Sequence, residues 1–372
     1  MATKKNIDMT EGKILPLLLA FAIPLFFTGI LQILYNAADT MVVGRFAGAQ
    51  SMAAIGATTS LYHLIINLFV GLSMGVNVVA AHNYGAKDME KLGRTVHTAI
   101  TIAFLGGLLI SVIGYFAAPL LLRMTGTPED VFPKAVLYMR IIFLGQPVNL
   151  LYNFGSAVLR AYGDTKRPLY YLLFAGAVNV VANLFFVIVL HMDVAGVAVA
   201  TIMSQAISAV LVIRNLMTTE DVVRLNLKNL GVQKKELKEI IRIGLPAGLQ
   251  SSLFAISNVV IQSSINSFGS LVIAGNTAAL NVESFLNMTA TTMDQTNLSA
   301  VSQNYGAGKN ERLKKVVASS LVLTTVLSVV LGLLMILFGP FILSFYTEDP
   351  AVIEYGMVRI SILMATYSFY AI

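Results

Sequence analysis

The sequence predicts an all-α integral membrane protein built from two six-helix lobes that repeat in parallel. Three observations predict this fold class. Apolar residues make up 56% of the chain and charged residues 12%, whereas soluble domains carry about 25% charged residues. The mean hydropathy is +0.77, and long apolar segments recur along the whole chain. Landmarks of the first half also return in the second half at a nearly constant spacing.

Ten apolar segments are long enough to cross a bilayer, which takes about 20 residues of helix. We expect helices, because lipid offers backbone groups no partner and the segments lack the alternating pattern of barrel strands. In chain order the segments are 14–42, 52–82, 95–122, 134–159, 168–190, 194–217, 238–267, 271–302, 315–345 and 352–372. Pro24, Pro147 and Pro246 lie inside three of them and are expected to kink those helices.

The positive charges predict the orientation of these segments. With a cytoplasmic N-terminus, all but five of the 25 Lys and Arg residues lie on the cytoplasmic side, as the positive-inside rule requires. The exceptions are Arg45, Arg123, Lys134, Arg140 and Arg359. The net charge of +6 therefore reflects topology and not nucleic-acid binding. We expect a multi-pass protein of the bacterial inner membrane.

Four landmarks indicate an internal duplication. Asn83-Tyr84-Gly85-Ala86 returns as Asn304-Tyr305-Gly306-Ala307, an offset of 304 − 83 = 221. The other pairs are Pro119 with Pro340, Pro24 with Pro246, and Arg140 with Arg359. An even number of spans in each copy makes the repeat parallel, which is a known plan of secondary transporters.

The duplication predicts an N-terminal lobe at 1–217, a polar cytoplasmic linker at 218–237 and a C-terminal lobe at 238–372. With the repeat offset of 221 residues, the second half ends within its fourth span. About ten of twelve expected spans are therefore present, and we expect the chain to be a fragment of a longer protein.

Polar side chains inside the first-half spans mark a candidate site, because such groups are costly in lipid. Gln32, Asn36 and Asp39 follow i, i+4, i+7 spacing and share one helical face. The other first-half candidates are Tyr35, Asn179, Asn183, Thr201 and Gln205. We predict that they face one cavity. Loss of water stabilises the neutral form of a carboxylate, so Asp39 could load and release a proton. It could equally form a Na⁺ site with amide and hydroxyl oxygens.

In the second half, Glu283, Asn287 and Asp294 lie on roughly one face of the eighth segment and are predicted to line a substrate cavity. The sequence contains no P-loop or other catalytic motif, and we expect neither an enzyme nor a bound cofactor. Transport energy would then come from an H⁺ or Na⁺ gradient. We assign no firm metal site beyond the Na⁺ site that Asp39 could form.

Three stretches resemble the multidrug and toxic compound extrusion (MATE) family. They are 32–44 (QILYNAADTMVVG), the two Asn-Tyr-Gly-Ala turns and 159–165 (LRAYGDT), set in the double six-span plan. The resemblance implies two lobes that form a V and export organic cations and other drugs in exchange for H⁺ or Na⁺.

Residue by residue, the resemblance implies roles for several positions. Asp39 matches the coupling carboxylate of the family, and Glu283 matches an acid found in part of it. Asn183 stands where relatives often carry an acid, and 250–254 lacks the glutamate that some relatives carry in the seventh span. Gln32, Tyr35, Asn179 and Thr201 match polar positions of the N-terminal lobe.

We therefore expect a monomeric exporter of cationic, amphipathic drugs that works by alternating access. The alternative is a lipid-linked saccharide flippase of the same superfamily, which would need basic residues in its cavity to hold a pyrophosphate. The mid-membrane charges of this chain are acidic, which favours cationic cargo. A sensor or assembly protein without transport activity is a third class.

Overall fold

A computed structural model describes residues 6–219, 223–266, 268–345, 347 and 349–370. Within this part of the chain, all regular structure is helical. The elements are α1 (Ile14–Val42), η1 (Val43–Ala47), α2 (Ala49–Gly85), α3 (Met89–Met124), α4 (Phe132–Leu144), α5 (Gln146–Ala161), α6 (Lys166–Leu184), η2 (Phe185–Val189), α7 (Asp193–Thr218), η3 (Leu227–Asn229), α8 (Lys234–Asn266), α9 (Ser270–Gly306), α10 (Asn310–Ser344) and α11 (Pro350–Tyr370). The segments η1 and η2 are π-helices.

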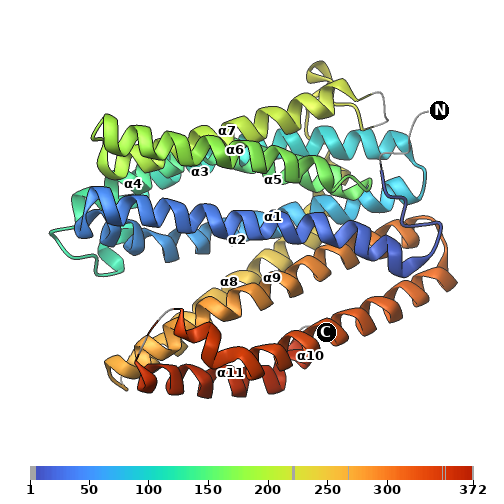
Figure 1. The fold of residues 1–372 in the computed structure, drawn as a ribbon. Helices are drawn as coiled ribbons and strands as arrows, with labels where there is room; N and C mark the ends of the chain where they lie inside the picture. Colours follow the sequence, from blue (N-terminus) through green and yellow to red (C-terminus); the bar gives the residue numbers. More distant parts are fainter. Residues whose placement is uncertain (1–5, 220–222, 267, 346, 348, 371–372) are drawn as a thin grey trace.

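Two groups of helices, α1–α7 and α8–α11, form the arms of a V (Figure 1). They meet at the end of the molecule that holds the N-terminus and diverge toward the opposite end. We call these the closed end and the open end. The arrangement confirms the predicted all-α, two-lobe membrane fold. Matching positions in the lobes also share local structure, since Gly48 and Gly269 precede α2 and α9 with φ values of +87° and +95°.

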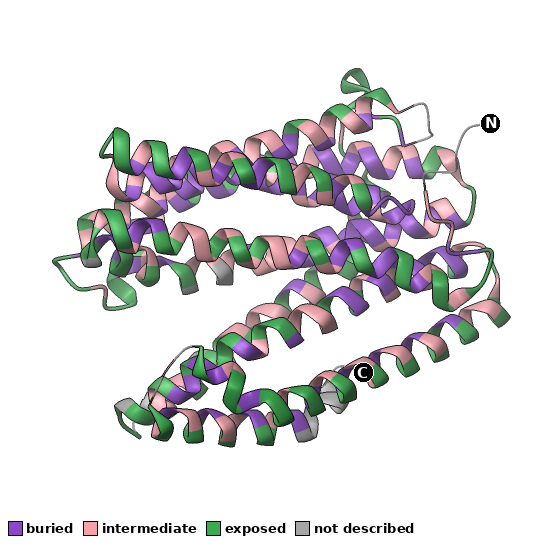
Figure 2. Cartoon of the chain, in the orientation of Figure 1, coloured by how far each residue is buried: buried purple, intermediate pink, exposed green. Residues whose placement is uncertain are grey.

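Seven helices of the described chain are long and apolar enough to cross a membrane, or eight if α4 and α5 form one span. The helices α9 and α11 fall outside this count, although they contain 37 and 21 residues. Large apolar side chains lie exposed on the outer helices, such as Phe116 at 74% and Leu337 at 71%. Figure 2 shows such exposed positions along both lobes. This exterior suits contact with lipid.

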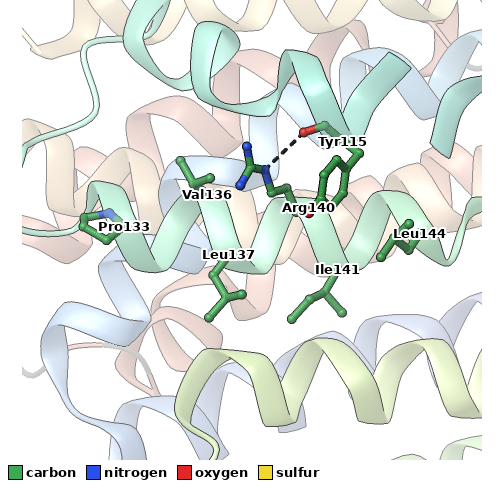
Figure 3. A pocket seen from close by; sticks show the side chains of 7 residues that line it. All are labelled: Tyr115, Pro133, Val136, Leu137, Arg140, Ile141 and Leu144. Carbon is green, nitrogen blue, oxygen red and sulfur yellow. Dashed lines mark hydrogen bonds between the residues drawn. The ribbon is translucent and has the colours of Figure 1, made fainter. Parts of the chain in front are cut away.

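The expected span 134–159 is not one straight helix, because the chain forms two helices there, α4 and α5, bent by 47°. The break falls at Gly145, where a Cβ atom would lie 2.5 Å from Ile202 Cγ1 on α7. Pro147 lies in the first turn of α5, a position that needs no backbone N–H donor. It therefore helps to start a helix and does not kink one. The helix α4 also borders a groove shared with α3 (Figure 3).

The lobes come into main-chain contact where α2 crosses α8. A Cβ atom on Gly75 would lie 2.5 Å from the Ile240 carbonyl oxygen, and one on Gly244 would lie 2.6 Å from Leu72 Cα. Gly71 and Gly248 approach each other in the same way. Small residues allow such backbone contact between membrane helices. The main chains of the two lobes therefore come into direct contact here.

Residues 6–13, which we call the N-terminal strap, bridge both lobes at the closed end. The Ile7 N–H donates to the Gly163 carbonyl of the first lobe at 3.0 Å. The Met9 N–H donates to Gln303 Oε1 of α9 at 2.9 Å. Arg312 of α10 donates to three strap carbonyls, those of Met9, Glu11 and Gly12. The strap therefore ties the two lobes together.

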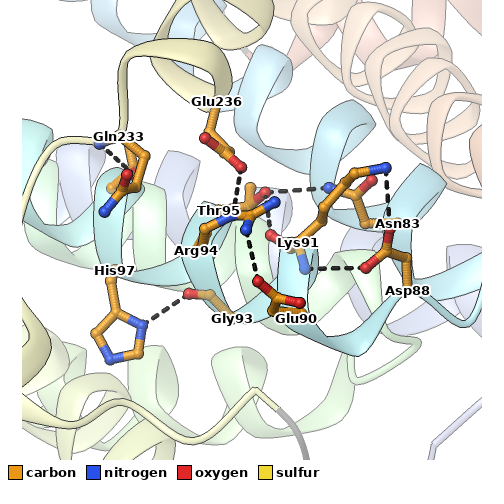
Figure 4. Close-up of polar contacts among 11 residues, drawn as sticks. Asn83, Asp88, Glu90, Lys91, Gly93, Arg94, Thr95, His97, Gln233 and Glu236 are labelled. Atoms are coloured by element: carbon orange, nitrogen blue, oxygen red, sulfur yellow. Dashed lines mark hydrogen bonds and ion pairs between the residues drawn. The ribbon is translucent and has the colours of Figure 1, made fainter.

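A second polar junction holds the start of α8 and the preceding linker against α3 (Figure 4). Arg94 pairs with Glu236 at 2.8 Å and with Glu90 at 2.7 Å. The His97 Nε2 accepts the Asn226 N–H at 3.0 Å, and its Nδ1 lies 2.7 Å from the Gly93 carbonyl oxygen. Neutral His97 with its hydrogen on Nδ1 satisfies both contacts.

Candidate functional site

Asp39 lies on α1 where α1, α6 and α7 come together. Its Oδ1 accepts a hydrogen bond from Asn183 Nδ2 of α6, and its Oδ2 lies 3.3 Å from Thr201 Oγ1 of α7. Within the described chain, Asp39 makes no ion pair. The carboxyl group is therefore surrounded by neutral polar groups, and no Lys or Arg side chain offsets its charge.

Asn179 completes this cluster from one turn earlier on α6. The Asn183 Nδ2 also lies 3.3 Å from Asn179 Oδ1, and the two residues are 0% and 3% exposed, respectively. The Asn183 Oδ1 is buried and has no hydrogen-bond partner. A buried amide oxygen without a partner costs free energy. The structure thus brings together the four predicted coupling residues, and their role in coupling stays a prediction.

The hydroxyl of Thr201 has two acceptors for one hydrogen. Its Oγ1 lies 2.9 Å from the Val197 carbonyl oxygen and 3.3 Å from Asp39 Oδ2. If Thr201 donates its hydrogen to the Val197 carbonyl oxygen, which is the shorter contact, no hydrogen lies between Thr201 Oγ1 and Asp39 Oδ2. The lone pairs of these two oxygens then face each other at 3.3 Å. A hydrogen on Asp39 Oδ2 would satisfy both contacts at once. The geometry therefore accommodates a protonated Asp39.

Both π-helices lie just beyond these residues on the side of the open end. The segment η1 begins four residues after Asp39, and η2 begins two residues after Asn183. π-Helical turns are rare and often accompany functional sites. The apolar cluster of Val42, Val43, Val187 and Val197 packs at the same level, with Tyr138 against it. Asp39 is therefore separated from the open end by an apolar layer.

A second polar cluster lies beside α7, one turn beyond Thr201. Tyr62 of α2 accepts a hydrogen bond from Asn149 Nδ2 of α5 at 2.9 Å and is also hydrogen-bonded to Gln146 and Gln205. The Asn153 Nδ2 donates to Asn149 Oδ1 at 2.5 Å. Of these residues, only Gln205 is among the candidates predicted from the sequence. The i, i+3, i+7 spacing of Gln146, Asn149 and Asn153 was a usable signal.

The remaining α1 residues do not join the Asp39 cluster. Gln32 and Asn36 are exposed, although they share the predicted face with Asp39. The Tyr35 hydroxyl donates toward the Leu172 and Leu173 carbonyls of α6, at 3.2 and 3.3 Å. Its ring lies against Gly176, where a Cβ atom would collide with it. Tyr35 therefore holds α1 against α6.

The second-lobe candidates are dispersed along α9. Glu283 pairs with Arg359 of α11 at 2.8 Å, and Arg359 also donates to Asn276 Oδ1 at 2.8 Å. The Glu283 charge is therefore offset within the lobe. Asn287 is half-buried and Asp294 is exposed. None of these contacts links Glu283 or Asp294 to the Asp39 cluster.

Known proteins similar to this chain match it over most of its length. The MatE family model matches residues 24–185 and 246–372. The probable multidrug resistance protein YpnP of Bacillus subtilis is 27% identical over 98% of this chain and 82% of its own. The probable multidrug resistance protein YoeA of the same organism is 30% identical over 88% of this chain and 73% of its own.

The fold is also that of solved transporters. A structure described as an outward-facing conformation of a MATE transporter superposes with a TM-score of 0.91, at 22% identity, over 100% of this chain and 83% of its own. These matches favour the exporter over the flippase. With its membrane-spanning helices, the chain belongs to the multidrug and toxic compound extrusion (MATE) family of efflux transporters.

Proposed function

We propose that this chain exports amphipathic organic cations and other drugs in exchange for protons, and that Asp39 carries the proton. The multidrug resistance proteins YpnP and YoeA support drug efflux. The N-terminus is proposed to be cytoplasmic, as the positive-inside rule indicates. The open end then faces away from the cytoplasm.

The observation that carries the proposal is the hydroxyl of Thr201. With one hydrogen between the Val197 carbonyl and Asp39 Oδ2, Thr201 and Asp39 are both satisfied when Asp39 holds a proton. Loss of that proton leaves a carboxylate without a Lys or Arg partner in the membrane. Such a charge is costly unless a cation replaces the proton. Proton and organic cation therefore compete for one group.

Protons fit this cluster better than Na⁺. The hydrogen bond at Asp39 Oδ1 comes from an N–H donor of Asn183, whereas Na⁺ requires oxygen lone pairs on every side. Asn183 would have to turn its amide to offer Oδ1 to the ion. A proton needs no such rearrangement. We accordingly propose H⁺ as the coupling ion, with Na⁺ as the alternative that the experiment separates.

Uptake of ethidium into inside-out vesicles tests the proposal. An acidic lumen should drive uptake, because protons leave the lumen as the drug enters. A sodium gradient of equal size should not drive it. The Asp39→Asn variant should lose the gradient-driven uptake, since an amide cannot release a proton. Asp130→Asn is the matched control, because Asp130 is exposed in the turn between α3 and α4.

Each outcome decides a separate point. Uptake driven by sodium alone would replace the proton with Na⁺ and leave the role of Asp39 in place. Equal uptake by Asp39→Asn and wild type would remove Asp39 from coupling. No uptake with either gradient, from folded protein, would overturn drug export itself.

A further inference from the structure

A groove of the first lobe is lined by residues of α3 and α4, and none of them belongs to the Asp39 cluster (Figure 3). Its volume is about 310 Å³. The lining residues are Tyr115, Pro133, Val136, Leu137, Arg140, Ile141 and Leu144. Six of the seven side chains are mainly apolar, and the single charge is the Arg140 guanidinium.

Arg140 is held in place but its charge is not offset. Its Nε donates to the Tyr115 carbonyl oxygen at 3.2 Å, and its guanidinium lies 4.8 Å from the centre of the Tyr115 ring. Within the described residues it makes no ion pair. A guanidinium has five N–H donors, and among the described residues one of them, Nε–H, donates to a protein acceptor.

The internal repeat shows that this charge is unusual. Arg359, the counterpart of Arg140 in the second lobe, pairs with Glu283 at 2.8 Å. The offset of 221 places Tyr62 at the position of Glu283 (283 − 221 = 62). The first lobe therefore lacks the acid that offsets the same charge in the second lobe. Its Arg is turned instead toward the groove.

The estimated depth of Arg140 lies just inside the boundary between the hydrocarbon core and the lipid headgroups. The helix α3 has 36 residues and is about 54 Å long at 1.5 Å per residue. With α3 centred on the bilayer midplane, Tyr115 lies about 13 Å from that plane. The hydrocarbon core ends about 15 Å from the midplane. Arg140 contacts Tyr115 and is therefore close to the headgroup boundary.

We propose that this groove binds one anionic glycerophospholipid, with its phosphate on Arg140 and an acyl chain along the apolar wall. The guanidinium forms two parallel hydrogen bonds to a phosphate, while Leu137, Ile141 and Leu144 contact the chain. The positive charge disfavours the cationic drugs proposed as cargo. The apolar wall favours a lipid over free phosphate. The site is therefore independent of the Asp39 cluster.

Native mass spectrometry of the whole chain tests the proposal with phosphatidylglycerol as the probe. Wild type should retain one phosphatidylglycerol molecule in preference to diacylglycerol, which has the same chains without the phosphate. Arg140→Gln should lower that retention at least about tenfold, the effect of losing a charge-assisted hydrogen bond. Arg140→Lys should retain an intermediate amount, because it keeps the charge without the planar fork.

Arg45→Gln is the matched control, because Arg45 is an exposed cation at the same open end. It should bind as wild type does. Equal loss in both variants would overturn the proposal and indicate a general effect of charge. Unchanged retention in Arg140→Gln would also overturn it. Displacement of the lipid by inorganic phosphate would assign the site to a free anion. An unchanged melting temperature shows that each variant folds.

Discussion

At the scale of single residues, Asp39 and Thr201 form the most specific contact of the candidate site. The carboxyl group meets an amide and a hydroxyl, and the hydroxyl has a second acceptor in the Val197 carbonyl. Three helices contribute to this contact. Small changes in their positions therefore alter the distances between the Asp39 carboxyl group and its two polar neighbours.

We predict that Thr201→Val lowers proton-driven ethidium uptake by roughly tenfold. The methyl group that replaces the hydroxyl leaves Asp39 Oδ2 without its partner, and an unpaired buried polar group costs about 1–3 kcal/mol. Thr201→Ser keeps the hydroxyl and should retain most of the uptake. Vesicle uptake at matched expression measures both variants. Equal activity of the Val and Ser variants would exclude the hydroxyl from coupling.

Four of the predicted residues come together, whereas others do not, and the reason is physical. Asp39, Asn179, Asn183 and Thr201 lie on three helices whose buried faces the polar spacing correctly indicated. The spacing of polar residues along one helix does not show which neighbouring helix those residues contact. Gln32 shares a face with Asp39 yet lies where no helix covers α1.

At the scale of helices, tertiary contacts decided what the sequence alone left undetermined. The segment 134–159 is apolar throughout, so hydropathy predicts one span. In the structure it forms two helices that break at Gly145. Beyond the break, Gln146 and Asn149 of α5 lie against Tyr62 of α2. The second polar cluster therefore depends on a bend that periodicity does not reveal.

We predict that Gly75→Ala destabilises the protein, because its Cβ atom would lie 2.5 Å from the Ile240 carbonyl oxygen. The backbone atoms cannot move aside as a side chain would, and overpacking of this kind costs about 1–3 kcal/mol. The melting temperature in detergent should fall by a few degrees. Gly93→Ala on α3 is the control, because open space surrounds that position. It should be neutral or slightly stabilising.

At the scale of the whole molecule, polar contacts hold the lobes together at the closed end. The strap lies between Gly163 of one lobe and Gln303 of the other. Ser299 of α9 also donates to Asn77 Oδ1 of α2 at 3.0 Å, across the same junction. Separation of the lobes at the closed end requires these hydrogen bonds to break. At the open end the lobes are already apart.

We predict that Arg312→Gln loosens the strap. Arg312 donates to the carbonyls of Met9, Glu11 and Gly12, and hydrogen bonds from a charged donor contribute about 1.5–3 kcal/mol. Amide hydrogen exchange of residues 6–13 should accelerate at least about tenfold. Lys314→Gln is the control, because Lys314 is exposed and pairs only with Glu311 in the described structure. Similar exchange in both variants would contradict a role for Arg312 in holding the strap.

The glycine crossing of α2 and α8 is expected to act as the pivot if the lobes move relative to one another. Contacts there join backbone to backbone, so main-chain atoms set the distance between the lobes at this point. The hydrogen bonds of the strap and of Ser299 with Asn77 would then determine how readily the lobes separate at the closed end.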